Sequence, residues 1–241
     1  MSSEMWIVLA AGLKVPWARV PMYNTIMGLA AGTGLVLLVW FGADLLRRRP
    51  IEFDGWALAF GIVGLIQFVT GLHMTLTWPI AFIAPWDDIY FGETCLAFGT
   101  LLLAVAFYLW RRRPELVDLG PDELIARLQA VIRPNTVFVL ALGLALFWVG
   151  IFPLAYPVFE APPQEPISGH FSNLPRLESS LFTVLWWAIA LGCLLFPWAI
   201  RSLNRTLLTV VALAWVLPGI GLILFVAMNF FTHGGLTYNT R

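Results

Sequence analysis

The chain has 241 residues, of which 60% are hydrophobic and 12% are charged. A soluble domain has roughly 45–50% apolar and 25% charged residues, so this composition excludes an ordinary soluble protein and predicts an integral membrane protein whose main partner is the lipid bilayer. The formal net charge is zero, which argues against a nucleic-acid partner, and two cysteines provide no disulfide framework.

Six apolar segments predict an all-α, polytopic membrane helical bundle in a single transmembrane domain. A span needs roughly 20 apolar residues to cross the hydrocarbon core. The predicted spans are 23–46, 55–78, 91–110, 135–156, 177–200 and 206–232. Residues 1–21 lack the basic start and the cleavage site of a secretory signal, so we expect this segment to be retained, with its apolar part at the membrane interface.

The basic residues predict the orientation of the spans. Ten of them flank the spans on one side: Arg47, Arg48, Arg49, Arg111, Arg112, Arg113, Arg127, Arg133, Arg201 and Arg205. Four lie on the other side: Lys14, Arg19, Arg176 and Arg241. Because cytoplasmic loops carry the excess of Lys and Arg, we expect a multi-pass protein of the cytoplasmic membrane with both termini outside.

Two connecting segments have distinct compositions. Residues 121–132 begin with Pro and two acids and carry apolar residues at helical spacing. They predict a cytoplasmic amphipathic helix that either lies flat on the membrane or packs as a short helix on the bundle. The outer loop, 157–176, is rich in Pro, Ser and Asn and should be irregular.

Short internal matches suggest a repeat. "YNTIMGLAAGT" (23–33) and "YFGETCLAFGT" (90–100) share Tyr followed by Leu-Ala-x-Gly-Thr, and "RRRP" follows each of these two spans. "GIVGLIQFV" (61–69) returns as "GIGLILFV" (219–226), and "ETCL" at Glu93 returns as "ESSL" at Glu178. We therefore expect three related helical hairpins, formed by spans 1–2, 3–4 and 5–6.

Candidate functional residues gather toward the predicted outer side. A polar group in hydrocarbon is costly, so His73 near the end of the second span should have a polar partner: Glu93 or a group near Tyr23 and Asn24. His73 should also face the bundle interior or an outward-opening cavity. The candidate cofactor-binding residues are His73, Glu93, Glu178, His233, Tyr23 and Asn24, and the candidate metal ligands are His73 and Glu93.

Each candidate also has an ordinary structural explanation. Glu93 and Glu178 occupy first turns, where a carboxylate stabilises the helix dipole. Gln67, near the middle of the second span, is better explained by a hydrogen bond between helices than by a transport path. His73 and His233 reach the same depth for a bis-histidine haem only if the sixth span starts late, tilts, or breaks at "LPGIG" (217–221).

The stretches "YNTIMGLAAGT", "TGLHMTLTWP" and "FGETCLAFG" resemble a family of prokaryotic integral membrane proteins, catalogued as domain of unknown function 981. The residues that carry the resemblance are Tyr23, Asn24, His73, Met74, Trp78, Pro79, Gly92 and Glu93. The resemblance implies a multi-span protein of the cytoplasmic membrane. It implies no activity and no catalytic residue.

Three functions remain open. In the first, an outer His/Glu site binds a metal such as copper, a haem or a quinone, in a redox or accessory subunit of a membrane complex. In the second, the chain is a small-solute or ion transporter or channel that uses Gln67 and the "LPGIG" segment. In the third, it is a purely structural subunit. No catalytic motif is present, so we do not expect the chain to be an enzyme on its own.

Overall fold

The computed structural model describes residues 15–156, 158–159, 161–174 and 176–241. The expectation for the N-terminal segment falls largely on residues 1–14, which lie outside the described residues. Six long helices form the bundle: α2 (Asn24–Leu46), α3 (Phe53–Thr77), α5 (Thr94–Leu116), α6 (Pro121–Ala155), α7 (Arg176–Ser202) and α8 (Arg205–Asn239). All six are long and apolar enough to cross a membrane, and the described part of the chain contains no strand.

Four short elements complete the described chain. They are η1 (Trp17–Arg19), α4 (Pro85–Asp87), the π-helix η2 (Asp88–Glu93) and η3 (Ser168–Phe171). Elements α4, η2 and α5 follow one another without a gap, so the third span begins near Pro85. The outer loop, expected to be irregular, contains the single helical turn η3.

The two faces of α3 explain how a nearly continuous apolar sequence packs as one helix. Its buried face consists mainly of small, aromatic and polar residues: Ala57, Phe60, Gly64, Gln67, Gly71 and Met74. Its exposed face carries large aliphatic residues: Leu58, Ile62, Leu65, Val69 and Leu76. Both sets follow the period of 3.6 residues per turn. An exposed aliphatic stripe of this kind is stable in lipid and unfavourable in water.

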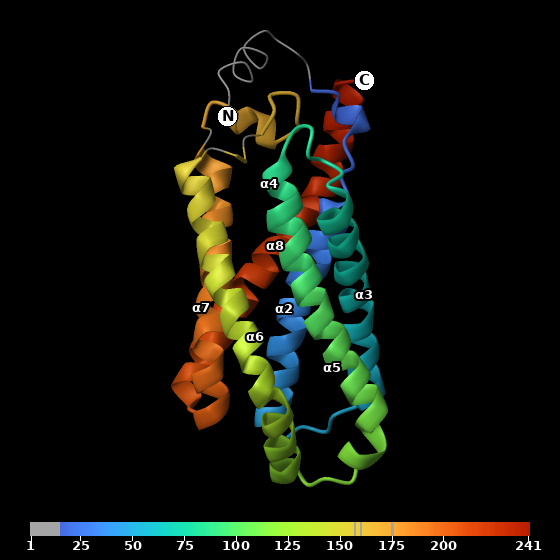
Figure 1. Ribbon diagram of the computed structural model, residues 1–241, viewed down its shortest axis with the longest axis vertical. Helices are drawn as coiled ribbons and strands as arrows, with labels where there is room; N and C mark the ends of the chain where they lie inside the picture. The colour runs from blue at the N-terminus through green and yellow to red at the C-terminus, as the bar shows by residue number, and fades with distance from the viewer. Residues whose placement is uncertain (1–14, 157, 160, 175) are drawn as a thin grey trace.

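The helices run alternately up and down, so the two ends of the molecule differ in composition (Figure 1). The turn η1 and the C-terminus lie at one end, which we call the termini end. The opposite end carries the loops after α2, α5 and α7, and we call it the arginine end because Arg47, Arg113 and Arg205 lie there. The segregation of basic residues deduced from the sequence is therefore present in the fold.

One predicted helix boundary is wrong. Residues 121–132 are neither a separate amphipathic helix nor a short one, because they form the first part of the continuous helix α6. Leu124 and Leu128 pack there in a core cluster that includes Phe53 and Leu116. The "LPGIG" segment, considered as a place where the sixth span could break, does not interrupt the helix. Pro218 lies inside α8, which continues to Asn239. In both cases burial against neighbouring helices outweighs a local helix-breaking signal.

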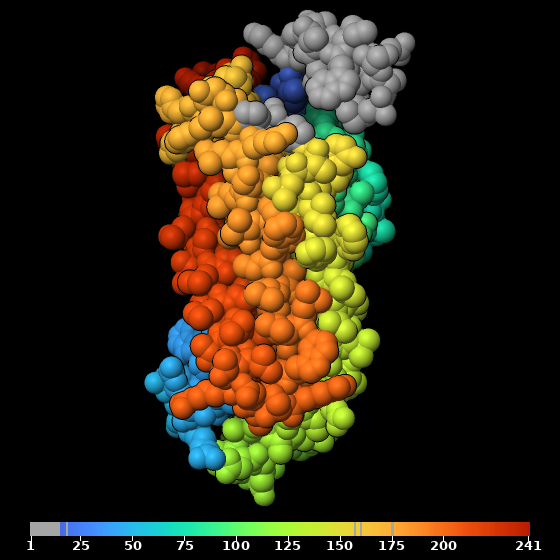
Figure 2. Space-filling view, turned by 90° about the vertical axis from the view of Figure 1, so that its left-hand side faces the viewer, coloured from blue at the N-terminus to red at the C-terminus, as the bar shows by residue number. Residues whose placement is uncertain are grey.

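The helices form three intimate pairs: α3 with α5, α6 with α7, and α2 with α8. The sequence predicted spans 1–2, 3–4 and 5–6 as the hairpins. Helices α2 and α3 do pack together, as do α7 and α8, but α5 and α6 touch only slightly. Figure 2 shows α7 between α6 and α8 on one face of the molecule.

Glycines determine two of these pairs. A Cβ atom at Gly99 of α5 would lie 2.4 Å from the backbone nitrogen of Phe68 in α3, and one at Gly32 of α2 would lie 2.5 Å from the Gly219 carbonyl oxygen in α8. Such spacing brings two helix backbones together, as small residues do in membranes. Both Leu-Ala-x-Gly-Thr segments thus pack against a copy of the other repeated motif, "GIVGLIQFV" or "GIGLILFV".

Candidate functional site: the termini-end residues and the interhelical cavity

Tyr23 and His73 form one polar contact at the termini end. The Tyr23 hydroxyl lies 3.0 Å from His73 Nδ1, and the rings meet edge to face with centroids 5.7 Å apart. A partner near Tyr23 and Asn24 was one of the two predicted for His73, and it is confirmed. His73 itself is exposed, so it does not face the bundle interior, which was one of the two orientations expected for it.

Glu93 and His73 do not form a ligand pair in the described structure. Glu93 is exposed at the junction of η2 and α5, and no hydrogen bond or ion pair joins it to His73 among the described residues. The other contact of the His73 ring is a long one, with Nε2 3.5 Å from Thr77 Oγ1 on the same helix. The contacts of the described residues therefore give no support to a metal site formed by these two side chains.

His233 makes a different contact, with a residue that sequence reasoning missed. His233 Nε2 lies 3.6 Å from Glu165 Oε1, and both side chains are largely buried. Glu165 belongs to the loop between α6 and α7, and burial raises the pKa of its carboxyl above the ordinary value. Glu178, half-buried in the first turn of α7, lies nearby. Only the fold brings Glu165 to α8, because the loop and His233 are far apart in sequence.

The described residues do not assemble a metal or haem site from the predicted ligands. No three His, Cys, Asp or Glu side chains converge in a way that could hold a metal ion, within the ranges that the structure describes. His73 and His233 each contact a separate partner, Tyr23 and Glu165 respectively. Among the described residues, the two histidines therefore belong to two separate polar contacts and not to one site.

A large cavity lies inside the bundle. Its volume is about 1160 Å³, and residues of all six long helices line it. Ligand pockets usually measure roughly 300–1000 Å³, so this cavity is large enough for a lipid-sized molecule. Both α5 and α6, which make little contact with each other, contribute to its lining.

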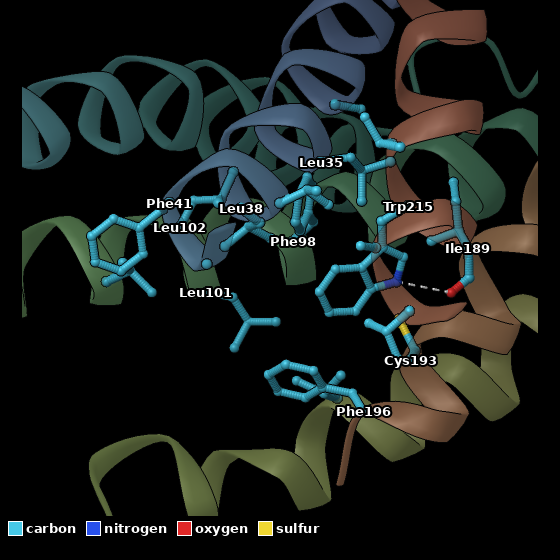
Figure 3. Close-up of a pocket in the computed structure, with 18 of the residues that line it drawn as sticks. Leu35, Leu38, Phe41, Phe98, Leu101, Leu102, Ile189, Cys193, Phe196 and Trp215 are labelled. Atoms are coloured by element: carbon cyan, nitrogen blue, oxygen red, sulfur yellow. Dashed lines mark hydrogen bonds between the residues drawn. The ribbon is translucent and has the colours of Figure 1, made fainter. Parts of the chain in front are cut away.

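The middle of the cavity is apolar. Figure 3 shows aliphatic and aromatic side chains of α2, α5, α7 and α8 around an open space, among them Leu38, Leu101 and Phe196. Trp215 belongs to this lining, and its indole Nε1 donates to the Ile189 carbonyl oxygen at 3.3 Å. Because its only donor is used within the protein, the Trp215 ring presents an apolar surface to the cavity.

Polar residues line the cavity only toward its two ends. At the end nearer the termini, which we call the amide end, lie Asn24, Gln67 and Asn229. At the other end Arg47, Arg48 and Arg205 contribute to the lining. No Asp or Glu is among the described residues that line the cavity. Such a distribution suits a long apolar molecule with a polar group at one end.

Two residues singled out in the sequence therefore belong to the cavity. Asn24 was predicted as part of an outer cofactor site, and its side chain lines the amide end. Gln67 makes the expected hydrogen bond between helices, with Nε2 donating to the Met27 carbonyl oxygen of α2. Sequence reasoning missed the aromatic lining, including Trp186 and Trp215, because aromatic residues in apolar helices give no signal that separates cavity lining from ordinary packing.

Comparison with known proteins identifies the family. The model of the family described as Protein of unknown function (DUF981) matches residues 22–234, so the chain belongs to this family. The match confirms the resemblance noted in the sequence. No curated protein and no solved structure is detectably similar to the chain.

Proposed function

We propose that this member of the DUF981 family crosses the cytoplasmic membrane six times and binds a long-chain, lipid-soluble molecule inside its helical bundle. The observation that carries the proposal is the cavity of about 1160 Å³ with an apolar middle and polar ends. The excess of arginines at one end favours an orientation with that end in the cytoplasm and both termini outside.

The chemistry of the lining selects the class of ligand. Water is a poor occupant of a space walled by Leu, Phe and Trp side chains, because buried water needs several polar partners. Hydrocarbon chains are the surrounding solvent in a membrane and match this wall. Filling the cavity with such a chain also restores the van der Waals contacts that an empty interior lacks.

This proposal retains one of the three cofactor hypotheses. A quinone with an isoprenoid tail is a long-chain, lipid-soluble molecule, so it belongs to the proposed ligand class. Copper and haem need several convergent ligands, and the described His and Glu side chains give that hypothesis no support. A role as an accessory subunit of a membrane complex is compatible with the binding of such a ligand.

The proposal can be tested with a photoreactive probe, hexadecanol that carries a diazirine in the middle of its chain. Gly42 lines the cavity and has no heavy atom of another residue near the position of its missing Cβ, so Gly42→Phe should fill space without a clash. Gly234 is equally uncrowded but lies outside the cavity lining, so Gly234→Phe is the matched control.

We expect irradiation to label cavity-lining peptides, such as those that contain Leu101 or Phe196. Gly42→Phe should reduce this labelling several-fold, whereas Gly234→Phe should leave it unchanged. Labelling confined to the exposed stripe of α3, with the same yield in both variants, would refute the proposal.

A further inference from the structure

Gln67 presents an unpaired hydrogen-bond acceptor at the amide end of the cavity. The side chain is fully buried, and its Nε2 donates to the Met27 carbonyl oxygen on α2. A carbonyl oxygen can only accept, so this bond requires the NH₂ group of the amide to face Met27. The orientation of the amide is therefore determined, and Oε1 faces away from α2.

The Oε1 atom of Gln67 is buried and has no hydrogen-bond partner among the described residues. An unpaired buried acceptor is unfavourable, and it is more so in an apolar interior. Gln67 also lines the cavity, so a ligand that displaces the side chains covering Oε1 can supply the missing donor.

Two more amides lie at the same level of the bundle. Asn24 is one helical turn before Met27 on α2, and its Oδ1 is also buried without a described partner. A Cβ at Gly28 would lie 2.6 Å from Val226 Cγ2, which places the neighbouring turn of α8, with Asn229, beside the start of α2. Both Asn24 and Asn229 line the cavity. Three helices thus bring amide groups to one end of an apolar space.

We infer that the polar group of the ligand is a neutral hydroxyl that donates a hydrogen bond to Gln67 Oε1. The inference rests on the proposed function and specifies its ligand class: a long-chain alcohol or a hydroquinone with an apolar tail. A carbonyl or ether head cannot donate to Oε1. An ammonium head could donate, but no described Asp or Glu lines the cavity to neutralise its charge.

The arginines at the opposite end do not require an anionic ligand. Basic residues concentrate at the cytoplasmic side of membrane proteins whether or not a ligand is present. Arg48 is already paired, with its Nη2 2.7 Å from Asp122 Oδ1. The buried acceptors of the amide end have no such general explanation.

The decisive measurement compares the binding of two probes, hexadecanol and its methyl ether, to the purified full-length protein by displacement of the diazirine probe. The two probes differ in the hydroxyl donor. We expect the wild-type protein to bind the alcohol about tenfold more tightly than the ether. Equal affinity of the wild-type protein for both probes would overturn the inference, with no variant required.

Variants assign the preference to Gln67. Gln67→Met keeps a similar volume and removes the acceptor, so it should bind alcohol and ether equally. The control is Gln164→Met, since Gln164 is exposed in the loop between α6 and α7 and does not line the cavity. This control should retain the preference for hexadecanol over the methyl ether. A Gln67→Met protein that still prefers the alcohol as strongly as the wild-type protein does would contradict the role of Gln67.

The hydroxyl group could come from a long-chain alcohol or from a hydroquinone. A second pair of probes, the reduced and oxidised forms of a quinone with a decyl tail, distinguishes these two sources. Preference for the reduced form, at higher affinity than hexadecanol, would identify a hydroquinone site. Hexadecanol binding more tightly than the reduced quinone would identify an alcohol site. If neither chain-bearing probe binds the cavity, the proposed function fails. If both bind without any preference for a donor, only the inference about Gln67 fails.

Discussion

Gly99 of α5 lies directly against Phe68 of α3, so closely that a methyl group at Gly99 would sit 2.4 Å from the Phe68 backbone nitrogen. This approach lets the two helices share a long interface with direct backbone contact at the glycine. The same relationship recurs between Gly32 of α2 and Gly219 of α8. The repeated sequence motifs are therefore packing motifs, and each joins a downward helix to an upward one (Figure 1).

The first prediction concerns this contact. Gly99→Ala should destabilise the protein by about 1–3 kcal/mol, because the added methyl group overpacks two helix backbones. Gly42→Ala makes the same chemical change at an uncrowded position, and it should be neutral or slightly stabilising. Unfolding in mixed micelles measures the difference. Equal stabilities of the two variants would show that α3 and α5 are not in close contact.

The second prediction concerns orientation. A reporter inserted after Arg49 or Arg113 should have a cytoplasmic location, and a reporter at the C-terminus should be external. The fold requires the first two positions to agree, because both lie at the arginine end. A cytoplasmic C-terminus together with a cytoplasmic Arg113 fusion would be incompatible with six alternating spans.

The third prediction concerns the contact between Tyr23 and His73. A double-mutant cycle with Tyr23→Phe and His73→Ala should give a coupling energy of about 0.5–1.5 kcal/mol, the usual value of one hydrogen bond. The control is a second double-mutant cycle, in which Thr77→Val takes the place of His73→Ala beside Tyr23→Phe. Thr77 contacts the His73 ring only at 3.5 Å and has no recorded bond to Tyr23, so its coupling with Tyr23 should be close to zero. A Tyr23–His73 coupling no larger than the control would exclude this bond.

The fourth prediction concerns Glu165. Burial raises the pKa of its carboxyl above the ordinary value of 4.5, so the folded state binds the proton more strongly than the unfolded chain. Stability from this group is thus present below that ordinary value and is lost as the pH rises through the folded pKa. A protonated His233, which lies beside Glu165, would limit this loss of stability.

Glu165→Gln should therefore lose less stability than the wild-type protein between about pH 5 and about pH 8. Thermal unfolding at both pH values measures this change. Glu93→Gln, at an exposed position, should keep the wild-type pH dependence. A Glu165→Gln protein with the full wild-type pH dependence would mean that burial of this carboxyl does not control stability.

The sequence by itself determined the six spans, their alternation and the accumulation of arginines at one end. These features depend on local properties, since roughly 20 apolar residues suffice to form a span and flanking charges determine its direction. The sequence also predicted that His73 has a partner near Tyr23 and that Gln67 bonds to another helix. Both predictions follow from the cost of leaving a polar group unpaired in an apolar environment.

Only the tertiary structure decided which helices pack together and what lies between them. Apolar residues are equally compatible with lipid and with a neighbouring helix, so hydropathy cannot identify the partner of α5. Backbone contacts such as Gly99 with Phe68 make α3 that partner, and both α5 and α6 line the cavity while they make little contact with each other. The unpaired oxygen of Gln67 is likewise a product of the fold, because it depends on Met27 holding the other end of the amide.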